Sequence, residues 1–88
     1  MFTMTQEAKT HLATVLDRSG ATPATAFRIV VEGPQINLHP DTERKGDAAF
    51  ASDERTVLLA DPEVMRVMED RVLDVETNPS GESHLTLK

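Results

Sequence analysis

The sequence of 88 residues contains no cysteine, tryptophan or tyrosine, and its only aromatic residues are three phenylalanines. Without cysteine the chain has no disulfide, no thiolate nucleophile and no sulfur ligand for a metal. Without tryptophan and tyrosine it lacks most of the side chains on which single-stranded nucleic acids stack. The hydrophobic core must therefore consist mainly of aliphatic residues and methionine. Functions that need thiolates and functions that need binding of single-stranded nucleic acid are both disfavoured.

Positive charge is also scarce. Nine lysines and arginines face fifteen acidic residues, which gives a formal net charge of −6. This charge repels nucleic-acid phosphates and anionic membrane surfaces, so we expect neither as a partner. No apolar run approaches the roughly 20 residues that span a bilayer, and the N-terminal residues carry no signal-peptide pattern. We expect a cytoplasmic protein that folds as a single domain over residues 1–88.

Two segments have the pattern of a helix. Thr5 is placed to cap a helix over residues 6–18, and Gly20 lies just past its end. Asp61-Pro62-Glu63 is typical of a helix start, and this second helix should end near Asp70. The apolar positions recur at helical spacing. They are Ala8, His11, Leu12, Val15 and Leu16 in the first helix, and Val64, Val67 and Met68 in the second, extended by Met65.

Six segments have the alternation or composition of β-strands. They are residues 26–32, 35–39, 48–51, 56–60, 71–76 and 84–88. Short breaks at 33–34, 52–55 and 78–81 predict hairpins, and residues 40–46 read as a charged loop. We expect Val31, Val57 and Leu58 in the core, and Arg44 and Lys45 at the surface. The order predicts an α+β fold in which mixed β-sheets form a sandwich-like body with two packed helices.

Candidate functional residues are few. His39, Asp41 and Glu43 place an imidazole and two carboxylates in one predicted loop, which a hard or borderline cation accepts. His11, His39 and His84 would suit zinc if they converged in space, although their spacing does not require it. His11 is otherwise expected at the edge of the core. No known catalytic motif is present, so we expect a protein that is not an enzyme and has no cofactor.

The ordered set of elements resembles the HesB/IscA (A-type) family of iron–sulfur proteins, and the likeness covers nearly the whole chain. The matching segments are Thr5 to Leu16, Val31-Glu32-Gly33, Phe50 with Ser52-Asp53, Val57-Leu58-Leu59, Asp61-Pro62-Glu63 and Leu73-Asp74-Val75. The resemblance implies a HesB-like domain.

The three cluster ligands of that family are missing from this chain. Members carry a cysteine just after the strand-ending glycine and a Cys-Gly-Cys motif after the last strand. Here Gly33 is followed by Pro34-Gln35, and Lys88 lies where the second motif would begin. Because iron–sulfur clusters need thiolates or imidazoles, the resemblance implies the fold without the cluster chemistry.

Three functions stay open on this basis. The first is a HesB/IscA-like protein that acts through protein contacts, associated with iron–sulfur assembly or with an unassigned role. The second is a module that binds a metal or small ligand through His39, Asp41 and Glu43. The third is a small enzyme of unknown type. A protein partner fits the first function, and a homodimer is one such arrangement.

Overall fold

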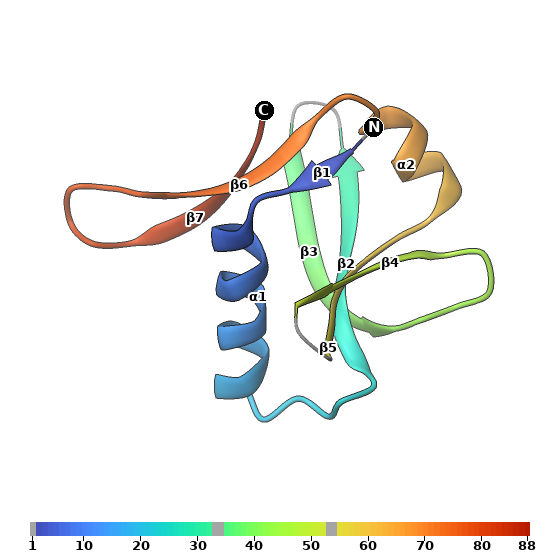
Figure 1. Cartoon of the computed structure of the whole chain (residues 1–88), viewed down its shortest axis with the longest axis horizontal. Helices are drawn as coiled ribbons and strands as arrows, with labels where there is room; N and C mark the ends of the chain where they lie inside the picture. The colour runs from blue at the N-terminus through green and yellow to red at the C-terminus, as the bar shows by residue number, and fades with distance from the viewer. Residues whose placement is uncertain (1, 33–34, 53–54) are drawn as a thin grey trace.

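The computed structural model describes residues 2–32, 35–52 and 55–88 (Figure 1). Its elements, in chain order, are β1 (Thr3–Met4), α1 (Gln6–Arg18), β2 (Thr25–Glu32), β3 (Gln35–Thr42), β4 (Ala48–Ser52), β5 (Arg55–Ala60), α2 (Pro62–Val67), β6 (Val72–Thr77) and β7 (Ser83–Leu87). The predicted breaks at Gly33-Pro34 and Asp53-Glu54 lie outside the described residues.

The strands form two mixed sheets. The larger sheet has the order β3-β2-β5-β4, with β2 and β5 parallel and the other two pairs antiparallel. The smaller has the order β1-β6-β7, and its β6–β7 hairpin extends beyond the rest of the chain (Figure 1). The predicted α+β fold with two mixed sheets and two helices is therefore confirmed.

One continuous core joins α1 to both sheets. Helix α1 buries Ala8, Leu12 and Leu16, because residues four apart lie on the same side of a helix. Strand β5 runs through the middle of the larger sheet, and its residues 57–60 are all buried. The large side chains that are fully buried are Leu12, Leu16, Ile29, Val57, Leu58, Leu59, Met68 and Leu73.

Both predicted helix caps are present. The hydroxyl of Thr5 accepts a hydrogen bond from the Ala8 N–H at 3.1 Å. The carboxylate of Asp61 accepts one from the Val64 N–H at 2.8 Å, and Pro62 occupies the first turn, where no donor is lost. These caps satisfy backbone donors that a helix start leaves without partners.

Several predicted boundaries are wrong. Helix α2 ends at Val67 and not near Asp70. Val67, expected on the apolar side of this helix, is 59% exposed. Strand β3 continues through residues 40–42, which pair with residues 25–27 of β2, so the charged loop is shorter than expected. Val31, expected in the core, is partly buried and packs against it.

Strand β1 was not predicted at all. It has only two residues, too few for a periodic pattern, and it forms through parallel pairing with Val72 and Leu73 of β6. The preceding Phe2 is buried at 5% exposure and meets Phe50 edge-on, with ring centroids 5.4 Å apart. The beginning of the chain thus belongs to the core.

Leu58→Ala should lower the free energy of unfolding by about 2–5 kcal/mol, because Leu58 is fully buried and its truncation leaves a cavity. Lys45→Ala, at an exposed position, should change it by less than about 0.5 kcal/mol. Urea unfolding monitored by circular dichroism measures both. Equal midpoints for the two variants would contradict the burial assignment.

Asp61→Ala should cost about 0.5–2 kcal/mol, because it removes the acceptor of the Val64 N–H. Asp61→Asn is the matched control and should stay close to the wild type, since asparagine caps helices about as well as aspartate. Thermal melts of the three proteins compare the two changes. An Asp61→Ala variant with unchanged stability would mean that this cap is unimportant.

Candidate functional site

A buried arginine is the centre of a cluster of charged residues. Arg28 lies in the middle of β2 with 7% of its surface exposed. Its Nε donates to Asp41 Oδ2 at 2.7 Å. Its Nη1 and Nη2 donate to the two carboxylate oxygens of Asp47 at 2.9 and 2.6 Å. This two-point contact with Asp47 is the geometry in which arginine binds a carboxylate most strongly.

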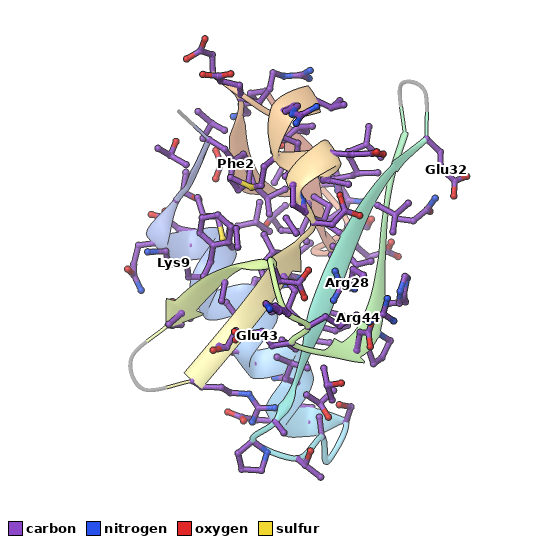
Figure 2. The ribbon with its side chains drawn as sticks, turned by 90° about the vertical axis from the view of Figure 1, so that its right-hand side faces the viewer. Phe2, Lys9, Arg28, Glu32, Glu43 and Arg44 are labelled. Carbon is purple, nitrogen blue, oxygen red and sulfur yellow. The ribbon has the colours of Figure 1, made fainter. Side chains whose placement is uncertain are left out.

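The two aspartates reach Arg28 from different parts of the chain. Asp41 belongs to β3, next to β2, whereas Asp47 lies in the loop before β4. Arg44, in the same loop, donates its backbone N–H to Asp47 at 2.7 Å and its guanidinium to Asp41 at 3.0 Å. Figure 2 shows Arg28 and Arg44 close together on one side of the larger sheet. The cluster therefore fastens the loop over residues 43–47 to the sheet.

The cluster is charged at neutral pH. Hydrogen bonds from Arg28 lower the pKa of Asp41, and they lower the pKa of Asp47 to about 2. The two carboxylates in turn raise the pKa of the Arg28 guanidinium. None of the three groups can exchange a proton near pH 7, so the cluster is unsuited to acid–base catalysis.

The three predicted cation ligands, His39, Asp41 and Glu43, are not grouped around a common point in the structure. Asp41 has one oxygen held by Arg28 and Arg44 and the other by the Thr42 N–H at 2.8 Å. His39 and Glu43 are exposed. Across residues 2–32, 35–52 and 55–88, no three histidine or acidic side chains are grouped to hold a metal ion.

The other two histidines lie elsewhere. His11 is half-buried on α1 and lines a shallow hollow of about 380 Å³ together with Glu7, Val75 and Ser83. His84 is exposed on β7 and pairs with Glu76 across the β6–β7 hairpin. The edge-of-core position predicted for His11 agrees with its partial burial.

Sequence reasoning missed Arg28 and Asp47. A signal was present, because Arg28 interrupts a strand that is otherwise apolar from Ala26 to Val31. A charged residue within such a run requires a partner of opposite charge, since burial of an isolated charge is costly. Which of the fifteen acidic residues meet Arg28 depends on the register of the strands, and the sequence pattern does not predict that register.

A second candidate region is a mainly aliphatic pocket beside β7. A pocket of about 270 Å³ opens between the β2–β3 hairpin, α2 and β7. It is lined by Val31, Ile36, Val67, Arg71, Leu85, Thr86 and Leu87. Val31 belongs to β2, Ile36 to β3, Val67 to α2, and residues 85–87 to β7. Among the described residues, its lining contains no cysteine, histidine or carboxylate that could bind iron.

No helix in the described part of the chain is both long and apolar enough to cross a bilayer.

Arg28→Met should lower the free energy of unfolding by about 3 kcal/mol at pH 7, because it leaves two carboxylates without their cation. Arg44→Met is the matched control. Its side chain is 69% exposed, so its loss should cost less than about 1 kcal/mol.

The Arg28→Met deficit should depend on pH. The folded-state pKa of Asp47 is lowered from 3.8 to about 2, so the stabilisation is complete above pH 4 and disappears as the pH falls toward 2. Urea midpoints at pH 7, 4 and 2.5 for wild type and variant measure this. A deficit that stays constant over this range would contradict the ionic role of the cluster.

Comparison with known proteins supports the fold. No protein-family model matches the sequence, and no curated protein matches it. Solved structures do match, among them the following two. Escherichia coli SufA, involved in biosynthesis of iron–sulfur clusters, has a TM-score of 0.77 and 18% identity over 99% of this chain and 83% of SufA. IscA, solved with a 2Fe–2S cluster, has a TM-score of 0.64 and 13% identity over 100% of this chain and 84% of IscA. At these identities the likeness shows that the chain has the SufA and IscA fold.

Proposed function

We propose that this chain is a non-enzymatic protein with the SufA and IscA fold that takes part in iron–sulfur cluster assembly through protein contacts, without holding a cluster itself. The observation that carries the proposal is the combination of that fold with a pocket that lacks iron ligands. The proposal includes a cytoplasmic location and the absence of a resident cofactor.

The chemistry of the pocket supports the part of the proposal that concerns the cluster. Iron–sulfur clusters are held by thiolates, with imidazoles as an occasional replacement. The chain has no cysteine, and the described lining of the pocket includes five aliphatic side chains and no histidine or carboxylate. The three histidines lie on α1, β3 and β7, and none of them lines the pocket.

The Arg28 cluster supports the non-enzymatic part. The charged groups of Arg28, Asp41 and Asp47 hydrogen-bond one another and nearby backbone. A catalytic group needs a pKa near the working pH or a free nucleophile, and these residues offer neither. The cluster is better explained as a set of contacts that fastens the loop over residues 43–47 to the larger sheet.

Anaerobic incubation of the purified protein with ferrous iron and sulfide, followed by desalting, tests the absence of a cluster. We expect no visible absorption to remain, because no thiolate is available to retain the iron. IscA treated in the same way is the positive control, since its structure contains a 2Fe–2S cluster. A chromophore that survives desalting on this chain would overturn the proposal.

The protein-contact part needs a separate measurement. An affinity-tagged copy expressed in its native cells is cross-linked, recovered and analysed by mass spectrometry, with a tagged unrelated protein of similar charge as the control. We expect enrichment of proteins that build, carry or receive iron–sulfur clusters. Recovery with no such enrichment would contradict the proposed association with cluster assembly.

A further inference from the structure

The strand edges of the structure differ in how well they are protected. Exposed edges attract other chains, and proteins usually block them with very short strands, prolines or bulges. Among the described residues, β1 has only two residues, β3 contains Pro40, and β4 has an irregular register between Phe50 and Ala51. Strand β7 has five residues with none of these features and pairs with β6 alone. Of the described edges it is the least protected by these three features, and only its C-terminal end is covered, by Arg71.

The backbone of β7 presents regularly spaced groups at this edge. Val72 and Lys88 exchange two hydrogen bonds, of 2.9 and 2.8 Å. In an antiparallel pair such positions alternate, so Ser83, Leu85 and Leu87 direct their N–H and C=O groups away from β6. The Leu87 carbonyl accepts a hydrogen bond from Arg71 at 3.2 Å. The remaining groups form the row of donors and acceptors with which an added strand pairs.

The aliphatic pocket lies beside this edge. Leu85 and Leu87 face the core side of the hairpin, and both line the pocket together with Val31, Ile36 and Val67. A strand added to β7 would place every second side chain on that side. At about 270 Å³ the pocket is slightly below the usual size of small-molecule sites, and it suits one or two aliphatic side chains.

The opposite side of the hairpin is acidic. Asp74, Glu76 and Glu82 belong to it, together with Lys88, which pairs with Asp74 at 3.0 Å and Glu76 at 3.6 Å. The guanidinium of Arg71 lies at the end of β7, where it donates to the carbonyls of Leu87 and Lys88, so the acidic groups outnumber the cations. Glu32 also points outward at the end of β2 (Figure 2). A second copy of the chain would bring the same acidic surface to this edge, whereas a basic segment would be attracted to it.

We propose that β7 is a docking edge for an extended, basic segment of a protein partner, which pairs with Ser83, Leu85 and Leu87 and places aliphatic side chains in the adjoining pocket. Backbone pairing supplies affinity and the pocket supplies selectivity, as in other cases of strand addition. Alternation of basic and aliphatic residues in that segment would match the acidic and apolar sides of the hairpin. This inference rests on the proposed function, because it names the surface through which a protein contact is made.

A seven-residue peptide of alternating lysine and valine, blocked at both ends, tests the docking edge by hydrogen exchange. The outward amides of Ser83, Leu85 and Leu87 should exchange rapidly in the free protein, and at saturating peptide their exchange should slow by about tenfold or more. The same peptide with N-methylated backbone keeps its charge but loses its donors, and it should give no protection. A peptide of alternating glutamate and valine should not bind.

Two exposed valines provide matched variants. Val67 is 59% exposed and lines the pocket, whereas Val15 is 38% exposed on α1 and does not. Val67→Ser should weaken peptide binding several-fold, and Val15→Ser should leave it unchanged. Both changes lie at exposed positions, so neither should unfold the protein.

Several results would overturn the inference. They are the absence of protection, equal protection by the N-methylated peptide, and an equal effect of the two valine variants. The β7 amides could instead become protected without peptide, to an extent that rises with protein concentration. Together with a doubled native mass, that result would mean that a second copy of the chain occupies the edge. If cells yield cluster-assembly proteins while the peptide fails, the proposed function stands and this surface is wrong. If both experiments fail, both proposals are wrong.

Discussion

The burial of Arg28 is the constraint on which the larger sheet depends. A guanidinium in the middle of β2 can be removed from water only if carboxylates replace its hydration, and Asp41 and Asp47 do so from two directions. Asp41 requires β3 to continue through residues 40–42, and Asp47 requires the following loop to fold back. The length of β3 and the path into β4 are thus both tied to one side chain.

The Arg28 cluster and the proposed docking edge differ in how far their polar groups are satisfied. Arg28, Asp41 and Asp47 hydrogen-bond one another and nearby backbone, whereas among the described residues β7 pairs with β6 alone. In the described part of the chain, the aliphatic pocket adjoins the β7 edge. The inferred docking surface is therefore separate from the Arg28 cluster.

The sequence predicted the elements with local patterns better than the features that depend on long-range pairing. Helix α1, the capped start of α2 and the alternating strands followed from periodicity and from Thr5 and Asp61. The end of α2, the extension of β3 and strand β1 did not, because each is set by partners distant in sequence. The same holds for the cluster around Arg28. The sequence shows that Arg28 interrupts an apolar strand, but only the folded loop before β4 brings Asp47 to it.

The smaller sheet joins the two ends of the described chain. Strand β1 at Thr3–Met4 pairs with β6, which begins at Val72, and Thr5 donates its hydroxyl hydrogen to Asp74 at 2.9 Å. During synthesis the N-terminal segment must therefore wait for about seventy residues before its partner leaves the ribosome. The larger sheet and α1 can assemble in that interval, whereas Phe2 and the first strand reach their positions only when translation of this region is nearly complete.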